Sequence, residues 1–192
     1  MVPHDEHRPR HGHAGHHHGD AGPAAEHRAR GRSARCRVIT VSDTRTLETD
    51  SSGARAAELL VAAGHTVGAR RIVPDERDAI ARAVRDALDD PETDAVILSG
   101  GTGLAPRDVT YETVRDLLEK PIDGFGELFR MLSFAEIGAA AMLSRAVAGT
   151  WGGRAVFSVP GSKAAVRLAW EKLIAPEAGH VVRELRKDAG RT

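Results

Sequence analysis

The sequence predicts a three-layer α/β/α fold with a mostly parallel sheet and an antiparallel hairpin near its C-terminus. Short β-branched segments alternate with helical patterns from residue 34 onward, which is the order of βαβ units. The segment "DAVILSG" (94–100) is almost entirely apolar, as expected for a strand that helices cover on both faces. Two glycines between two strand-like segments late in the chain indicate the hairpin.

The first half of the domain is predicted to contain three strands and two helices. Segment 35–41 ("RCRVITV") is a β-branched run typical of a strand. Segment 53–64 has helical apolar spacing and ends at Gly64, a residue type that commonly terminates helices. A strand over 65–73, an amphipathic helix over 76–88 and the buried strand over 94–100 follow. This βαβαβ order predicts parallel strands joined by right-handed crossovers, with helices on both faces of the sheet.

The second half is predicted to add one apolar helix and the hairpin. After a helix near 110–119, segment 124–143 ("GFGELFRMLSFAEIGAAAML") is helical and too apolar for a helix with one solvent face. We expect part of it to be buried between subunits, with intramolecular core as the alternative. Strands over 145–151 and 154–160 flank Gly152 and Gly153, and helices near 162–174 and 176–187 follow.

The first 33 residues differ in composition from the domain over 34–192. They contain no Leu, Ile, Phe, Tyr or Trp, and they hold eight of the ten histidines. Such a segment buries too little apolar surface to offset its ordering entropy, so we expect a disordered tail whose deletion costs little stability. Adventitious Zn²⁺ or Ni²⁺ binding by its histidines is the alternative to a purely solvated tail.

Composition excludes several classes of partner. The 27 basic and 27 acidic residues cancel, so no overall field attracts nucleic acid. No apolar run is long enough to span a membrane, and the N-terminus lacks a secretory apolar region. The single cysteine, Cys36, fits a reducing compartment. We therefore expect a cytoplasmic protein without nucleic-acid or membrane partners.

Candidate functional residues follow four predicted strands. Because ligands bind at the carboxyl ends of parallel strands, four loops are expected to share one edge of the sheet. The loops are "VSD" with "TDSSG", "VPDE", "SGGTGLAPRD" and "VPGS". The candidate binding residues in them are Ser42, Asp43, Ser52, Gly53, Gly100, Gly101, Thr102, Gly103, Pro160, Gly161 and Ser162. Ser42 and Ser52 are alternatively caps of the first helix.

The "SGGTG" segment is the most specific of these loops. Gly100, Gly101 and Gly103 allow positive φ and close approach of a ligand to the backbone, so that successive amides form a nest for an anion. Thr102 adds a hydroxyl group. The segment matches neither the Walker phosphate loop nor the dinucleotide fingerprint, and a plain tight turn is the alternative.

Two aspartates stand beside this predicted anion nest. Asp75 and Asp108 each lie between a strand and a helix, where aspartate often acts only as a helix cap. A carboxylate next to a phosphate site is otherwise repulsive. Two carboxylates that hold Mg²⁺ remove this conflict, because the cation bridges them to phosphate oxygens. The pattern thus offers a phosphate site with a magnesium ion at Asp75 and Asp108.

The loops together resemble the MoaB/MogA family of molybdenum cofactor biosynthesis proteins, which is related to the G domain of gephyrin and its plant counterpart. The resemblance covers about 35–187 and rests on "TVSDT", "SSG", "VPDE", "SGGTG", "PRDVT" and "VPGS" in family order. The segments "GFGELFRMLSFAEIG" and "SRAVAG" resemble the MoaB branch more closely.

The resemblance implies a molybdopterin-binding fold, assembled as a homotrimer or as a hexamer of trimers. It implies a molybdopterin adenylyltransferase that moves AMP from ATP to the terminal phosphate of molybdopterin with Mg²⁺, releasing pyrophosphate. The product would then pass to the molybdate-inserting enzyme. Asp75 and Asp108 match the two essential carboxylates, residues 100–103 match the glycine loop, and Ser144 matches the "LSR" serine.

Two other functions stay open. Some MoaB relatives lack the "PDE" carboxylate, so a non-catalytic pterin-binding or protein-interaction oligomer is an alternative; this chain retains both acids. Pterin carbinolamine dehydration would need a histidine cluster, and outside the tail the chain has only His65 and His180.

Overall fold

The computed structural model describes residues 33–187, so the predicted tail lies almost entirely outside the described part. Its centre is one sheet with the strand order β2-β1-β4-β7-β6-β5, in which β3 also pairs with β1. β2 is Thr66–Val67 and β3 is Arg71–Val73. β1 (Arg35–Val41) pairs in parallel with β4 (Ala95–Ser99), and β4 pairs in parallel with β7 (Arg154–Val159). β6 (Val147–Trp151) and β5 (Lys120–Pro121) are antiparallel additions at one side.

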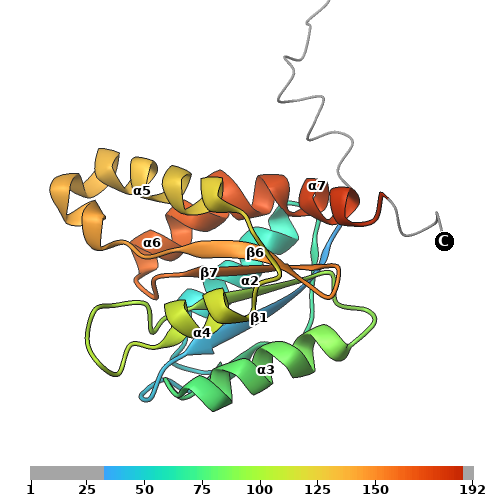
Figure 1. Ribbon diagram of the computed structural model, residues 1–192, viewed down its shortest axis with the longest axis horizontal. Helices are drawn as coiled ribbons and strands as arrows, with labels where there is room; N and C mark the ends of the chain where they lie inside the picture. Colours follow the sequence, from blue (N-terminus) through green and yellow to red (C-terminus); the bar gives the residue numbers. More distant parts are fainter. Residues whose placement is uncertain (1–32, 188–192) are drawn as a thin grey trace, which may run out of the picture.

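Helices cover both faces of the sheet, which confirms the three-layer prediction (Figure 1). One face carries α2 (Ser51–Ala62), α5 (Asp123–Ile137), α6 (Lys163–Ala169) and α7 (Ala175–Leu185). The other face carries α3 (Arg77–Asp89) and α4 (Thr110–Leu117). The strand between them, β4, is buried at all five positions, because both faces are covered.

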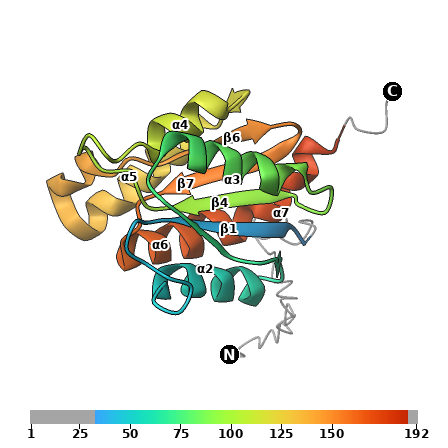
Figure 2. The ribbon, with the colours of Figure 1, turned by 90° about the horizontal axis from the view of Figure 1, so that it is seen from below.

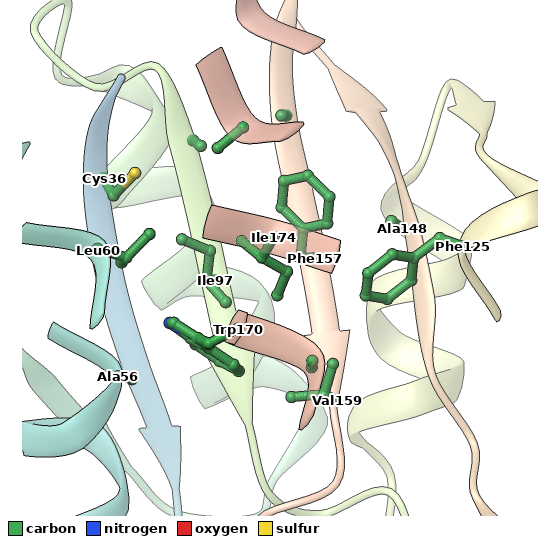
Figure 3. Packing of buried hydrophobic residues seen from close by; sticks show 14 of the residues in the cluster. Cys36, Ala56, Leu60, Ile97, Phe125, Ala148, Phe157, Val159, Trp170 and Ile174 are labelled. Carbon is green, nitrogen blue, oxygen red and sulfur yellow. The ribbon is translucent and has the colours of Figure 1, made fainter. Parts of the chain in front are cut away.

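The larger of two apolar clusters lies under α2, α5, α6 and α7 (Figure 3). Trp170, which is fully buried, lies beside Ile97 of β4. Phe125 of α5 and Phe157 of β7 meet edge to face, with ring centroids 5.4 Å apart. The smaller cluster lies under α3 and α4 and contains Ile80, Val84 and Leu98. Burying such side chains stabilises the fold by about 1.5–3 kcal/mol each.

The predicted hairpin is confirmed. β6 and β7 pair antiparallel up to Trp151 and Arg154, and the two residues between them have φ of +55° at Gly152 and +73° at Gly153. Left-handed conformations at both central positions match the twist of the flanking strands, and glycine adopts them without strain. This turn lies at the start of β7, so it is at the opposite end of that strand from the predicted ligand edge.

Three predicted elements differ in detail. The strand expected over 65–73 is broken into β2 (Thr66–Val67) and β3 (Arg71–Val73), which pair with opposite ends of β1. The helix expected over 124–143 ends at Ile137, because Gly138 has φ +61° and ψ −144°, and a 3₁₀ helix, η1 (Gly138–Leu143), follows. The last two predicted helices are instead joined by a π-helical segment, η2 (Trp170–Ile174).

No helix within residues 33–187 is both long and apolar enough to cross a membrane.

Candidate functional site

The four predicted loops meet at one edge of the sheet, on the left in Figure 2. β1, β4 and β7 are parallel and end together there, so the segments after them converge. Between them lies a cleft of about 450 Å³. It is lined by Val41, Ser42, Thr44, Arg45, Gly100, Gly101, Thr102, Gly103, Asp108, Leu143, Ser144, Pro160, Gly161 and Ser162.

Most of the predicted site residues line this cleft, but four do not. Ser42, Asp108, Ser144, the glycine loop and residues 160–162 are brought together there. The four outside the lining are Asp43, Ser52, Gly53 and Asp75. Sequence reasoning missed Thr44, Arg45 and Leu143, which do line it. The four residues outside the lining lie behind it and support the loops that form its walls.

The glycine loop adopts a conformation that side chains would block. Gly100 has φ +109°, and a Cβ there would lie 2.2 Å from the carbonyl oxygen of Val41. Gly101 has φ +61°. A Cβ on Gly161 would lie 2.9 Å from the Cα of Gly100, so the loops after β4 and β7 touch through their backbones. Gly103, in contrast to the expectation, does not have positive φ. It is needed because a Cβ would lie 2.5 Å from Oδ2 of Asp108.

Asp108 lies in the loop after β4 and faces the cleft. Its Oδ2 accepts a hydrogen bond of 3.1 Å from the backbone N–H of Ala105, within the same loop. The N-cap residue of α4 is Val109, whose side chain makes no capping bond. The alternative that Asp108 only caps the helix after it does not hold, because Val109 is the N-cap. The carboxylate folds the loop and keeps acceptor capacity for a ligand or cation on the cleft side.

Asp75 lies behind the glycine loop. Its Oδ1 accepts hydrogen bonds from the N–H of Val109 at 3.3 Å and from Oγ1 of Thr110 at 3.5 Å. A Cβ on Gly101 would lie 2.6 Å from both of its carboxylate oxygens. The N-cap of α3 is Glu76. Asp75 therefore does not cap its own helix but joins the loop after β3 to the first turn of α4.

Like charges gather around Asp75. Burial raises the pKa of the Asp75 carboxyl, and the nearby charges of Asp108 and Asp43 raise it further, while the hydrogen bond from Val109 opposes the rise. Asp43 also accepts a 3.0 Å hydrogen bond from the N–H of Asp75, so it positions this loop from outside the cleft. A carboxylate whose pKa is raised by neighbouring carboxylates is in an environment that a bound cation stabilises.

The loop after β1 is built around a buried carboxylate, Asp50, which is 1% exposed. Asp50 is the N-cap of α2 and accepts bonds from Gly53 N–H at 2.9 Å and Thr40 Oγ1 at 2.8 Å. A Cβ on Gly53 would lie 2.1 Å from Asp50, which explains this glycine. Asp50 directly precedes a helical pattern, and that signal could have identified the cap.

Neither serine of this loop caps α2. Ser42 accepts hydrogen bonds at Oγ from the N–H groups of Thr44 and Arg45, so it closes the turn that carries Arg45. Ser52 is buried, and its Oγ accepts a 3.3 Å bond from Nη1 of Arg45. Both serines therefore orient Arg45, which no motif in the sequence identifies as a cleft residue.

Arg145 holds the glycine loop from the side of β6. Its Nε donates to the carbonyl of Thr102 at 2.8 Å, and its Nη2 donates to that of Gly103 at 2.6 Å. Both terminal nitrogens also bond the carboxylate of Glu112 on α4, and this pairing holds the pKa of Glu112 below its usual range. The guanidinium lies over the ring of Tyr111, 4.8 Å from its centroid. Arg145 thus fixes the loop by its carbonyls. The N–H of Gly100 is also used, because it donates to the carbonyl of Val159 at 3.1 Å, which leaves the amides of Gly101 and Gly103 for a ligand.

The last wall comes from the loop after β7 and the end of η1. Ser162 is the N-cap of α6 and accepts a 3.2 Å bond from Ala165 N–H, which confirms its position at a helix start. Ser144 and the exposed side chain of Leu143 close the cleft from η1. The cleft thus combines backbone groups of the glycine loop, hydroxyl groups, the apolar side chains of Val41, Leu143 and Pro160, and the charges of Arg45 and Asp108.

A magnesium ion fits this donor set. Within residues 33–187 there is no group of three or more His, Cys, Asp or Glu side chains that could hold a metal. Mg²⁺ differs from zinc in needing only one or two carboxylates when a phosphate substrate supplies the other oxygens. Asp108, which faces the cleft, and Asp75, which shares its electrostatic environment, meet that requirement.

Known proteins resemble this chain over most of its length. The model of a family described as "Probable molybdopterin binding domain" matches residues 37–180. The Molybdenum cofactor biosynthesis protein B of Bacillus subtilis (strain 168) is 58% identical over 155 residues, which cover 80% of this chain and 91% of that protein. The corresponding protein of Halalkalibacterium halodurans is 54% identical over 158 residues, covering 82% and 93%.

Solved structures agree with the fold. A crystal structure of a Molybdenum cofactor biosynthesis protein B is 52% identical with a TM-score of 0.80, and the match covers 82% of this chain and 98% of that one. The tungsten cofactor synthesizing protein MoaB from Pyrococcus furiosus is 34% identical with a TM-score of 0.72, covering 81% and 99%. A MogA structure is 27% identical with a TM-score of 0.71, covering 79% and 99%. The chain therefore belongs to the molybdopterin-binding domain family, in its MoaB/MogA group, and is more similar to these MoaB proteins than to MogA.

Proposed function

We propose that this protein acts in molybdenum cofactor biosynthesis as a molybdopterin adenylyltransferase, which transfers AMP from ATP to the terminal phosphate of molybdopterin. The observation that carries the proposal is the glycine loop with Asp75 and Asp108 against it, at the carboxyl edge of a molybdopterin-binding domain. The relatives named above for molybdenum cofactor biosynthesis support the pathway.

The reaction needs positioning more than proton transfer. An oxygen of the pterin phosphate forms a bond to the α-phosphorus of ATP, the bond from that phosphorus to the β-bridging oxygen breaks, and pyrophosphate leaves. A phosphate monoester is largely a dianion at pH 7, so no general base is required. In-line alignment and stabilisation of negative charge lower the barrier instead.

The cleft residues suit these two tasks. The N–H of Gly100 donates to the carbonyl of Val159 at 3.1 Å, so the amides of Gly101 and Gly103 are the ones that would form a nest for phosphate oxygens. The hydroxyl groups of Ser144 and Thr102 add donors, although Thr102 itself is buried. Because Arg145 occupies the carbonyls of this loop, the amide side stays oriented toward the ligand.

Asp75 and Asp108 would hold the magnesium ion, with Asp108 as the ligand that faces the cleft. When bound, Mg²⁺ neutralises charge on the triphosphate and so favours attack by an anionic nucleophile. Asp43 keeps the Asp75 loop in place through the Asp75 N–H. The adenylylated pterin would then pass to the molybdate-inserting enzyme.

A non-catalytic pterin-binding or protein-interaction oligomer is the second candidate function. Exposed apolar side chains on α5 and η1 favour it, since Met131 is 60% exposed, Phe134 62% and Met142 79%. This surface suits a contact between subunits and is compatible with catalysis too. Dehydration of pterin carbinolamine has less support, because His65 is bonded to Ala34 N–H and to the carbonyl of Ala175, away from the cleft.

The purified protein incubated with ATP, Mg²⁺ and molybdopterin tests the proposal. We expect adenylylated molybdopterin and pyrophosphate in equal amounts, and no product when Mg²⁺ is chelated. The Arg55→Gln variant is a suitable control, because Arg55 pairs on the exposed surface of α2 with Glu58 and its loss should leave the rate unchanged. Binding of molybdopterin without product formation would refute the enzymatic proposal and support the binding-only candidate.

A further inference from the structure

Arg45 is the charged cleft residue that the proposed adenylyl transfer does not yet use. Of the described residues that line the cleft, it is the only cationic one, and Asp108 is the only acidic one. Arg45 lies on the segment that leads into α2, while Asp108 lies on the segment that leads into α4. These helices cover opposite faces of the sheet (Figure 2), so the two charged residues lie on segments that lead to opposite faces.

The charge of Arg45 is not cancelled by its surroundings. Asp50 is the acid beside it, with Nη1 of Arg45 3.7 Å from Oδ1. Asp50 is also paired with Arg70, whose Nη1 lies 3.5 Å from Oδ2. Arg70 donates further hydrogen bonds to the carbonyls of Asp50 and Leu47, so it is the more firmly held partner. One buried carboxylate between two guanidinium groups leaves a net positive charge, and of these two groups only Arg45 lines the cleft.

The guanidinium of Arg45 is also oriented with donors to spare. Its contacts to Ser52 and Asp50 both use Nη1. Within residues 33–187, its Nε and Nη2 groups make no hydrogen bond. The side chain is 35% exposed, so it reaches solvent at the cleft without extending freely into it. Holding one end of a guanidinium in place lowers the entropy that a ligand must overcome to bind the other end.

We propose that Arg45 binds a phosphate group of the ligand in the cleft, as a cationic subsite opposite the carboxylates. A guanidinium with two free donor groups matches the oxygens of a phosphate in a forked geometry. The proposal rests on the proposed function for the identity of the ligands, which offer this chemistry from two sources: the phosphate monoester of molybdopterin and the triphosphate of ATP. Phosphate on the side of Asp108 has a cation only through bound metal, whereas Arg45 supplies one directly.

Binding measurements on the full chain separate the two sources. We would titrate molybdopterin without ATP or Mg²⁺, and ATP with Mg²⁺ without molybdopterin, into the wild type and the Arg45→Gln variant. We expect the Kd of at least one ligand to rise about 10- to 100-fold, the value expected for a lost hydrogen-bonded charge pair. Loss confined to molybdopterin assigns the monoester, and loss confined to ATP assigns the triphosphate. Added NaCl should weaken binding less in the variant than in the wild type.

Arg70→Gln is the matched control, because Arg70 pairs with the same carboxylate but lies outside the cleft lining. This variant removes one positive charge beside Asp50 but keeps the donor groups of Arg45 in the cleft, so it should weaken ligand binding less than Arg45→Gln does. If Arg45→Gln does not fold, Arg45→Lys replaces it, because lysine keeps the charge beside Asp50 and loses the forked geometry. The Lys variant should lose less affinity than the loss of about 10- to 100-fold expected for Arg45→Gln.

Wild-type affinity of the Arg45→Gln variant for both ligands would overturn the inference. Equal losses in the Arg45 and Arg70 variants would also overturn it, because they would assign the effect to Asp50 and the start of α2. Failure of the proposed function is distinguishable: the wild type would then form no adenylylated product, while binding of molybdopterin could still depend on Arg45.

Discussion

The Gly101→Ala substitution tests how closely the glycine loop and the carboxylates depend on each other. Gly101 has φ +61°, and a Cβ there would lie 2.2 Å from Oγ1 of Thr110 and 2.6 Å from both carboxylate oxygens of Asp75. The left-handed conformation costs alanine about 1–2 kcal/mol. Displacing a packed threonine and a carboxylate adds about 1–3 kcal/mol. We therefore expect a loss of about 2–5 kcal/mol in the free energy of unfolding.

Gly152→Ala separates backbone strain from displacement. Gly152 has φ +55° and nothing within 4 Å of its added Cβ, so only the strain of about 1–2 kcal/mol applies. Urea denaturation compares the two variants, and the adenylyl-transfer rate is measured on both. Gly101→Ala should lose activity at least 100-fold, since it moves Asp75, whereas Gly152→Ala should keep it. Equal stability and equal activity of the two variants would refute this account of the loop.

Three further predictions follow from other contacts. Arg145→Met should lower the free energy of unfolding by about 1–3 kcal/mol in urea denaturation, because the carbonyls of Thr102 and Gly103 and the carboxylate of Glu112 lose their donor; a variant as stable as the wild type would contradict this. The pKa of Asp75 is raised in the folded state, so ionisation of this carboxyl opposes folding. Without Mg²⁺, the wild type should therefore lose stability relative to Asp75→Asn as the pH rises from about 4 through that pKa. Denaturation at a series of pH values should show no difference between the two proteins below about pH 4. The apolar face of α5 should be buried in a trimer-based assembly, so light scattering should report an oligomer that Phe134→Asp dissociates and Val61→Asp, equally exposed on α2, does not; a monomeric wild type at micromolar concentration would end this prediction.

The fold could be predicted where burial or a tight turn leaves a local signal in the sequence. The strand over 95–99 is buried on both faces and reads as a continuous apolar run, and the paired glycines at 152 and 153 specify their turn. The broken edge strand could not be predicted, because β2 and β3 pair with different ends of β1 while Arg70 between them reaches across to Asp50. The end of α5 before Gly138 could not be predicted, because the alanine-rich segment that follows continues the helical pattern.

The residues of the candidate site also fall into those that could be predicted from the sequence and those that could not. Residues at the ends of buried strands, such as Asp108 and the glycine loop, could be placed because the sheet brings strand ends together. Arg45 could not, because its position depends on Ser42, Ser52 and Asp50 within an irregular loop that has no period. The sequence predicts that Asp75 lines the cleft, whereas the structure places its carboxylate behind Gly101. The strand that precedes Asp75 gives no information on this contact.

The rate of adenylyl transfer by the Asp108→Asn variant tests the central claim most directly. Asparagine can still accept the 3.1 Å hydrogen bond from Ala105 N–H through its amide oxygen, but it is a poor ligand for Mg²⁺. The account predicts unchanged unfolding free energy, retained binding of molybdopterin, and a rate at least 100-fold lower, which corresponds to about 3 kcal/mol in the barrier. An Asp108→Asn protein that transfers AMP at the wild-type rate would contradict it.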